Sequence, residues 1–410
     1  MSEIYKILII AGESSGDNLG SKLINEMKRQ FNKNADINYS KKNELIFQGM
    51  GGSMMEKEGA ICLYGIENLS VMGFVEVISS IQKINSIIYR LTRYTNAWKP
   101  DLIITIDSPD FCLKLVKKIR KIDKFVPIIH YVAPSVWAWR SKRAKQMSLF
   151  YDKVLSILPF EKSFFEKYGL SCEFVGHPIF LEHLPNDDQI KKFFNFMKIE
   201  KSKRIISVLP GSRKSEIKFM LPIYAELIKN LRDQFEDLEF VIPSPKNVCE
   251  YLKLEVQKYN LNIKILSEVE LGVDAFNIFK FALFKVSTLA INTSGSVSLE
   301  LAKIGTPMIS AYKCGWFFEK ILKTFVKLKS ANLINIILNK QIIPEFLFEK
   351  CKVLYIENSV KELLINEVLQ TEQLNAFNQV INIYSSNEKK PSEKAAKMML
   401  EYLNSEISQF

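Results

Sequence analysis

Metal ligands, paired cysteines and long apolar runs are all scarce in this chain. It has three histidines and no D-x-D triplet, and its six cysteines are scattered without a C-x-x-C pair. Neither a metal cluster nor a disulfide framework is therefore indicated, and a reducing cytosol is the simplest inference. No window approaches the roughly 18 apolar residues of a membrane-spanning helix. The charged residues Glu3 and Lys6 precede only a short apolar run, so we expect no signal peptide.

Basic residues are in excess. Lysine and arginine number 56 against 45 acidic residues, for a net charge of +11. Such a balance suits nucleic acid, phosphorylated ligands or anionic lipid, although a lysine-rich compositional bias explains it equally well. The sequence has no helix-turn-helix, zinc-knuckle or RNP-type pattern, so we do not expect nucleic acid as a partner.

Short apolar runs alternate with helical patterns in both halves of the chain, which predicts parallel sheets covered by helices. The expected strands are 5–10, 102–106, 127–132, 154–158, 204–209, 239–242, 263–266, 289–292 and 308–312. Two sheets of similar size predict two Rossmann-like domains, with a boundary in the polar segment 176–189. We assign 1–180 to the first domain, 181–384 to the second and 385–410 to a helical tail.

The segment AGESSGD (11–17) contains a literal G-x-S-x-G between a strand and a helix. That pattern also marks the nucleophile elbow of hydrolases, with Ser14 as the attacking group. However, only one strand's worth of chain precedes Ser14, and the elbow needs an upstream loop for its oxyanion hole. A glycine-rich turn facing a ligand is the better interpretation, and a purely structural turn stays open. Glu13 and Asp17 suit sugar hydroxyls and would repel phosphate.

Two turns in the second half are better suited to phosphate. Gly211-Ser212-Arg213 joins a strand to a helix, where free N–H groups and a guanidinium bind anions. Ser294-Gly295-Ser296 precedes another helix, on which Glu300 is placed to accept ribose hydroxyls. Each turn alone is weak evidence, because such turns are often only helix caps. Their occurrence in one domain predicts a site for a diphosphate nucleotide.

Nine blocks occur in an order that resembles the lipid-A-disaccharide synthase family across residues 5–350. They are AGESSGD (11–17), GMGG (49–52), LSVMGFVEV (69–77), IDSPDF (106–111), HYVAPSVWAWR (130–140), FVGHP (174–178), LPGSRKSEI (209–217), SGSVSLE (294–300) and GTPMI (305–309). The resemblance implies a GT-B fold, with two Rossmann-like domains and parallel sheets facing a central cleft. It implies an inverting transfer of 2,3-diacylglucosamine from UDP to 2,3-diacylglucosamine 1-phosphate (lipid X). We expect no cofactor and, since a D-x-D triplet is missing and histidines are few, no metal.

The resemblance also implies roles for particular residues. Asp107 matches the family's proposed general base; Asp17 is the alternative base, although Asp17 and Glu13 more naturally order the acceptor or the loop. For UDP we expect Gly211, Ser212, Arg213, Ser294, Gly295, Ser296, Glu300 and Asn332. The residues themselves, rather than the resemblance, suggest Val71, Met72, Phe74 and Val75 for acyl chains or the bilayer, and Arg140, Lys142, Arg143 and Lys145 for lipid phosphates. A buried helix is the alternative for the first set, and a solvated face for the second.

The resemblance further implies a cytoplasmic enzyme at the surface of the inner membrane, and a homodimer in which the tail is exchanged or packs back on its own first domain. Two other classes stay open on sequence alone. One is another GT-B enzyme of UDP-N-acetylglucosamine, such as an epimerase or a muramyl-pathway transferase. The other is a lipid-binding protein without activity.

Overall fold

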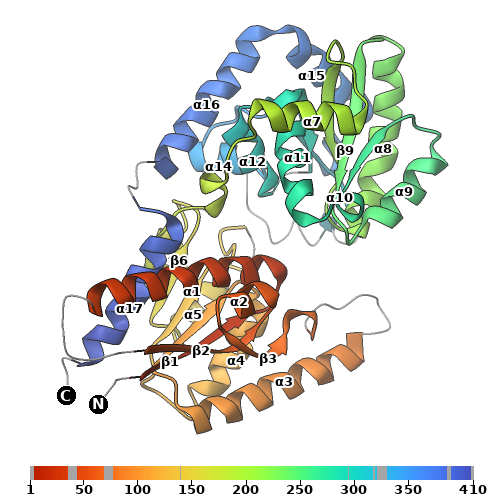
Figure 1. Ribbon diagram of the computed structural model, residues 1–410. Coiled ribbons are helices and arrows are strands. Elements are labelled where there is room, and N and C mark those ends of the chain that lie inside the picture. The colour runs from red at the N-terminus through yellow and green to blue at the C-terminus, as the bar shows by residue number, and fades with distance from the viewer. Residues whose placement is uncertain are drawn as a thin grey trace. The chain divides into compact units, whose positions relative to one another are not determined.

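The computed structural model describes residues 4–35, 44–68, 77–138, 140–293, 295–316, 319–320, 330–385 and 389–407. The chain divides into two compact units, one of residues 1–178 with 387–410 and one of residues 179–386. Each unit contains one parallel sheet with helices on both faces (Figure 1). The α/β fold class expected from the sequence, with two Rossmann-like sheets, is confirmed.

The sheet of the first unit has the order β3-β2-β1-β4-β5-β6-β7, and its neighbouring strands are all parallel. Its central strands bury side chains on both faces, which explains their nearly continuous runs of isoleucine and leucine. The strands are β1 (Ile4–Ala11), β2 (Glu44–Gly51), β3 (Ile61–Gly65), β4 (Leu102–Ile106), β5 (Ile128–Tyr131), β6 (Lys153–Ser156) and β7 (Ser171–Phe174).

Helices cover both faces of this sheet. One core cluster joins it to α3, α4, α5 and α6, and a second joins it to α1, α2 and α17. The bounds are α1 (Ser14–Ala35), α2 (Ser53–Lys57), α3 (Val77–Trp98), α4 (Pro109–Ile119), α5 (Lys142–Met147), α6 (Lys162–Glu166) and α17 (Pro391–Ile407), with a 3₁₀ turn at Ile66–Asn68. The terminal helix α17 crosses and packs against α1 (Figure 1), although more than 350 residues separate them in sequence.

The sheet of the second unit has the order β10-β9-β8-β11-β12-β13, again parallel. Its strands are β8 (Arg204–Leu209), β9 (Leu238–Ser244), β10 (Lys264–Ser267), β11 (Ser287–Asn292), β12 (Met308–Tyr312) and β13 (Glu345–Leu347). Helices α8, α9 and α15 share one core cluster with the strands. Elsewhere α7 packs on α11, and α16 packs on α12 and α14.

The helices of this unit are α7 (Asp187–Met197), α8 (Lys214–Arg232), α9 (Cys249–Lys258), α10 (Glu268–Leu271), α11 (Val273–Val286), α12 (Val297–Ile304), α14 (Leu333–Leu338), α15 (Val353–Ile365) and α16 (Glu367–Ser385). Two 3₁₀ turns span Pro178–Leu181 and Phe348–Lys350. Since all strands are parallel, their carboxyl ends lie at one edge of each sheet, where ligands of such folds bind.

Candidate active site

The carboxyl edge of the second sheet holds a cavity of about 480 Å³. Two strand-to-helix turns form it, one between β8 and α8 and one between β11 and α12. Of the residues expected to bind UDP, the cavity is lined by Gly211, Ser212, Arg213, Gly295, Ser296 and Glu300. Ser294 lies outside the described residues. The turns converge on one space because β8 and β11, which are not successive in the chain, are neighbours in the sheet.

The first turn is closed by a side chain of its own helix. Oε2 of Glu216 accepts hydrogen bonds from the backbone N–H groups of Ser212 (2.9 Å) and Arg213 (3.3 Å). Gly211 has φ +116°, and a Cβ there would lie 2.4 Å from Cβ of Glu216, so only glycine fits. The carboxylate thus occupies two N–H groups that the sequence assigns to phosphate. The Arg213 side chain, by contrast, is 79% exposed.

The second turn leads into α12, and Ser296 and Val297 at the start of this helix line the wall of the cavity. The first N–H groups of a helix lack an intrahelical acceptor and bind anions. One turn further on, Oε2 of Glu300 lies 2.8 Å from Nζ of Lys280 on α11. Lys280 also lines the cavity. The α12 end of the cavity therefore combines an anion site with a carboxylate held by a lysine.

Asn332 lies beside this cavity without lining it. Its side chain is fully buried and caps α14: Oδ1 accepts from the N–H of Ile334 (2.8 Å), and Nδ2 donates to Oγ of Ser310 (2.9 Å). Ser310 in turn donates to Oδ1 of Asn292 at the end of β11 (2.8 Å). Through this chain of bonds Asn332 fixes the strand ends that carry the cavity.

In the first unit, Asp107 follows β4 at the carboxyl edge of the sheet. Oδ2 accepts a hydrogen bond from Oγ of Ser15 (3.0 Å), and Oδ1 accepts from the N–H of Ser108 (2.9 Å). The register of β1 with β4, in which Ala11 pairs with Ile106, places the AGESSGD turn directly beside it. Glu13 is exposed on this turn and accepts a bond from Oγ of Ser108 (3.3 Å).

Backbone strain gathers at this edge. Asp107 (φ +55°) and Ser108 (φ +42°) are consecutive left-handed residues, and Val132 after β5 has φ +74°. A β-branched residue with positive φ is a genuine outlier, and such residues cluster where function fixes the geometry. The carboxyl ends of the neighbouring strands β4 and β5 therefore both carry the kind of backbone strain that is typical of active sites.

Asp17 performs a structural task. It is 4% exposed, and its carboxylate accepts three backbone N–H groups at the start of α2: from Gly52 (2.8 Å), Met54 and Met55 (both 3.1 Å). A Cβ on Gly52 would lie 2.6 Å from this carboxylate. Asp17 thus ties the AGESSGD and GMGG segments together, and its oxygens are already occupied.

Two basic residues expected to hold lipid phosphates are engaged elsewhere. Arg140 and Arg143 both pair with Asp110 at the start of α4, at 3.0 and 2.5 Å. Arg143 is also buried. The apolar residues Val71, Met72, Phe74 and Val75 lie outside the described residues.

The described residues include no group of three histidine, cysteine or acidic side chains arranged to hold a metal ion. No helix within the described ranges has the length and apolarity to cross a membrane.

Sequence reasoning missed Ser15, Ser108, Lys280 and Glu216. Glu216 had a signal, because it stands three residues after Arg213, the spacing of a capping box. Lys280 had a weaker one, as a lone charge within the apolar face of a helix.

Two Rossmann-like units, one with a cavity between paired phosphate-type turns, define the GT-B class. Among solved structures, the UDP-GlcNAc 2-epimerase of Neisseria meningitidis bound to UDP-GlcNAc matches with TM-score 0.60 and 12% identity, over 93% of this chain and 100% of that one. The Methanocaldococcus jannaschii UDP-GlcNAc 2-epimerase in complex with UDP-GlcNAc and UDP matches with TM-score 0.56 and 14% identity, over 93% and 100%. At such identities these likenesses concern the fold.

The family follows from sequence. The model of the family described as lipid-A-disaccharide synthetase matches residues 7–399. Lipid-A-disaccharide synthase of Rickettsia prowazekii is 35% identical over 96% of this chain and 98% of its own length. That of Nitrobacter winogradskyi is 34% identical over 97% and 95%. The chain belongs to the lipid-A-disaccharide synthase family, and it is a hexosyltransferase of lipid A biosynthesis.

Proposed function

We propose that this enzyme transfers 2,3-diacylglucosamine from UDP-2,3-diacylglucosamine to the 6-hydroxyl of 2,3-diacylglucosamine 1-phosphate. The products are the β-1,6-linked disaccharide 1-phosphate and UDP. Family membership supports the reaction. The observation that carries the donor site is the cavity at the carboxyl edge of the second sheet, where Arg213, the start of α12 and Glu300 meet.

UDP would occupy this cavity with its diphosphate toward the first turn of α12 and Arg213. The N–H groups of Ser296 and Val297 suit phosphate oxygens, and the exposed guanidinium adds charge. Glu300, held by Lys280, would accept the ribose hydroxyls. The aromatic rings that line the wall, Phe276, Phe284 and Tyr312, offer apolar surface to the uracil.

Asp107 would act as the general base. It takes the proton of the acceptor's 6-hydroxyl while that oxygen forms a bond to the anomeric carbon from the face opposite UDP. The bond between the anomeric carbon and the phosphate oxygen breaks, and its electron pair leaves with UDP, which gives inversion. Ser15 and Ser108 would orient the carboxylate, and Arg213 with the α12 N–H groups would stabilise the charge on the departing diphosphate.

Both substrates carry acyl chains, so the enzyme would work at the inner-membrane surface. On sequence alone, we propose that Val71, Met72, Phe74 and Val75 contact acyl chains. The absence of charged residues between 69 and 75 supports that assignment.

The decisive test is transfer of radiolabelled 2,3-diacylglucosamine from UDP to lipid X in detergent micelles, with wild type, Asp107→Asn and a control, Asp188→Asn, at an exposed carboxylate of α7. We expect Asp107→Asn to lower kcat by a factor of about 10²–10⁴, the usual contribution of a general base. The control should match wild type. Full activity of Asp107→Asn would reject the base assignment, and no transfer by wild type would reject the function.

A further inference from the structure

Glu161 is a buried carboxyl that no ion pair explains. Its side chain is 1% exposed, and no described lysine, arginine or histidine forms a salt bridge with it. Burial raises its pKa to about 8, so the group is mostly neutral at pH 7. It stands immediately before α6, where a polar side chain often caps the helix, but it makes no capping bond. A carboxyl buried at this cost therefore has another task.

The two oxygens of Glu161 accept hydrogen bonds from two different loops. Oε1 accepts from Nε1 of Trp137 (3.1 Å), and Oε2 accepts from the backbone N–H of Leu158 (3.1 Å). An apolar side chain would leave both donors without this acceptor, and glutamine would set its NH₂ group against one of them. A carboxyl at this position satisfies both donors, so the pairing explains why it is buried here.

Trp137 is the side chain that this carboxyl orients. Its indole ring also meets the Phe160 ring edge to face, with ring centres 5.1 Å apart at 85°. The hydrogen bond and the ring contact hold the indole at two separate points. The tryptophan is nevertheless only half-buried. It can therefore offer a fixed apolar surface to a ligand, which a fully buried tryptophan cannot.

Trp137 belongs to the same edge of the first sheet as Asp107. The N–H of Asp107 donates to the carbonyl oxygen of Tyr131 (3.0 Å), and the N–H of Ala133 donates to that of Leu155 (3.2 Å). The chain after β5 is thus fixed between Asp107 on one side and the end of β6 on the other. Trp137 follows Ala133 by four residues, which span at most about 14 Å of extended chain. The indole therefore stays near the carboxylate that is proposed as the base.

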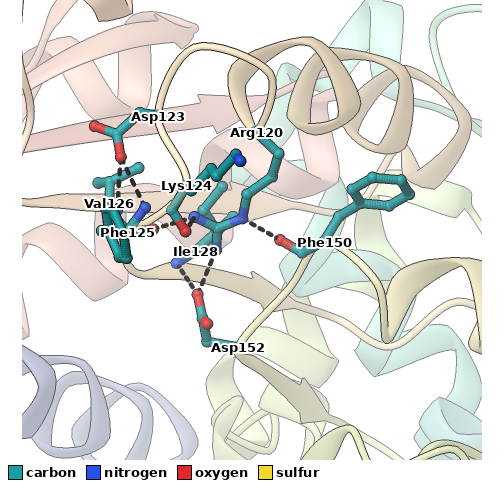
Figure 2. Close-up of polar contacts among 8 residues, drawn as sticks. All are labelled: Arg120, Asp123, Lys124, Phe125, Val126, Ile128, Phe150 and Asp152. Atoms are coloured by element: carbon teal, nitrogen blue, oxygen red, sulfur yellow. Dashed lines mark hydrogen bonds and ion pairs between the residues drawn. The ribbon is translucent and has the colours of Figure 1, made fainter.

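The opposite ends of β5 and β6 are fixed as well (Figure 2). Oδ2 of Asp152 accepts hydrogen bonds from the backbone N–H of Ile128 (2.7 Å) and from Nη2 of Arg120 (2.6 Å). Ile128 begins β5 and Asp152 directly precedes β6, so this carboxylate ties the amino ends of the two strands together. The loops that carry Trp137 and Glu161 therefore extend from two strands whose register is set.

We propose that Glu161 is a positioning residue of the acceptor site: it holds the Trp137 indole as a wall against which the glucosamine ring of the acceptor packs beside Asp107. The inference rests on the proposed function, which supplies the acceptor. The sugar ring, rather than an acyl chain, meets this wall, because the hydroxyl that Asp107 would deprotonate belongs to the sugar. The C–H face of a sugar ring is apolar and matches the flat surface of an indole.

The test is transfer kinetics in detergent micelles, with 2,3-diacylglucosamine 1-phosphate as the varied substrate. We expect Glu161→Gln to raise KM for this acceptor about tenfold, since the amide sets a donor against a donor and releases the indole. Trp137→Phe should raise KM by a similar factor. In both variants kcat should change by less than about twofold, because the wall binds the sugar equally in the ground state and in the transition state.

A double variant separates positioning from folding. In Trp137→Phe/Glu161→Gln the ring has no N–H, so the amide oxygen can accept from Leu158 while its NH₂ group meets no donor. The double variant should therefore have the acceptor KM of Trp137→Phe alone. A roughly hundredfold increase, the product of two independent effects, would show that Glu161 does not act through Trp137 and would overturn the proposal.

Each variant has a matched control in the same unit. Glu166→Gln changes an exposed carboxyl of α6, the helix that Glu161 precedes. Trp98→Phe changes a half-buried tryptophan that stacks on Tyr94 at the end of α3, on the amino side of β4 and hence at the edge opposite Asp107. Both controls should keep the wild-type acceptor KM. Calorimetric titration with UDP should be unchanged in every variant, because the proposed UDP cavity lies in the other unit.

Tryptophan fluorescence gives a readout that does not depend on transfer. Micelles containing 2,3-diacylglucosamine 1-phosphate, compared with empty micelles and without donor, should shift the emission of wild type and of Trp98→Phe but not that of Trp137→Phe. A titration of this shift also gives the acceptor Kd of Glu161→Gln, which we expect to rise about tenfold, as its KM does. The shift in wild type without any transfer would reject the proposed function and leave the Trp137 wall standing.

Three results would overturn the acceptor wall itself. One is a wild-type acceptor KM in both Glu161→Gln and Trp137→Phe. Another is no shift of wild-type emission at a saturating concentration of the acceptor. The third is an increase in KM that disappears when the acceptor carries short acyl chains, which would show that Trp137 contacts the hydrocarbon and not the sugar ring.

Discussion

Asp107 holds its left-handed conformation within a small set of hydrogen bonds: its N–H donates to the carbonyl oxygen of Tyr131, and its carboxylate accepts one bond from another segment of chain, that of Ser15. Removing the Ser15 hydroxyl should leave the carboxylate free to rotate away from the acceptor. We expect Ser15→Ala to lower kcat by about tenfold, since a hydrogen bond to a charged group contributes about 1.5–3 kcal/mol and this one is exposed. KM for the donor should not change, because the proposed donor site is in the other unit.

The control for this prediction is Ser14→Ala, at the neighbouring exposed hydroxyl. Steady-state kinetics in micelles, with both substrates varied, measures the effect. If Ser14→Ala and Ser15→Ala reduce kcat equally, the turn acts as a whole and the bond to Asp107 has no special part.

His130 shows how a polar residue of the first unit is used for packing. Nδ1 lies 2.7 Å from Oγ1 of Thr105, and Nε2 is buried without a partner among the described residues. Burial, and secondarily the charge of Arg143, lower the pKa of His130 from 6.5 to about 3. Below pH 6.5, His130 therefore binds a proton in the unfolded chain but stays neutral in the folded chain until the pH approaches 3.

This difference predicts a stability that falls as the pH is lowered from about 6.5 toward 3, and that is unaffected by this residue above pH 6.5. Urea unfolding at pH 7.5 and pH 5 measures this effect. Between these two pH values, the free energy of unfolding of His130→Asn should fall by less than that of wild type. His183→Asn, at an exposed histidine, should retain the wild-type loss. An unchanged loss in His130→Asn would place the acid sensitivity in other groups.

At the scale of elements, the β8–α8 turn depends on Gly211. Alanine there would have to adopt φ +116° and would place its Cβ against Glu216. We expect Gly211→Ala to displace Glu216, release the Ser212 and Arg213 N–H groups from their present positions, and weaken UDP binding at least tenfold with little change in overall stability. Isothermal titration calorimetry with UDP measures this.

The control is Gly169→Ala, which has φ +77° but open space around the added Cβ. It carries the conformational strain without the clash and lies in the other unit, so UDP binding should not change. Tighter UDP binding by Gly211→Ala would show instead that Glu216 blocks the site and that its displacement frees it.

The elements also show how much of the fold and of the candidate site can be predicted from the sequence. Every apolar run named as a strand forms one, whereas β2, β3, β7 and β13 were not expected. In β2 the apolar run is only Leu45–Phe47, because a glutamine and a glycine follow it. β3, β7 and β13 lie at sheet edges, where a strand has one neighbour and partial burial, so no continuous apolar run is required of it. The phosphate-type turns could be found because glycine and serine mark them locally. The pairing of Lys280 with Glu300 could not, because it depends on how α11 packs against α12.

At the scale of the whole molecule, the first unit is assembled from two distant pieces of chain. Helix α17 buries Ala395, Ala396, Met399, Leu400 and Leu403 against the sheet and α1. Nε2 of Gln30 donates to the carbonyl oxygen of Glu393 (2.9 Å), and the Lys394 ammonium donates to that of Phe174. Without this helix, one face of the sheet would lose part of its cover.

The second unit, in contrast, is continuous from 179 to 386 and contains every residue that lines the cavity proposed for UDP. A fragment of residues 179–386 should therefore fold alone and bind UDP within about threefold of the full chain.

A fragment of residues 1–178 should unfold at a lower temperature than the first unit of the full chain and should bind the apolar dye ANS, because the face that α17 covers is exposed. A synthetic peptide of residues 387–410 should restore its stability in a saturable manner, whereas the same peptide with Met399 and Leu400 changed to serine should not. If residues 1–178 alone were as stable as the peptide complex, the apolar contact of α17 would add nothing to the first unit, and its place would be explained by the tether to α16 alone.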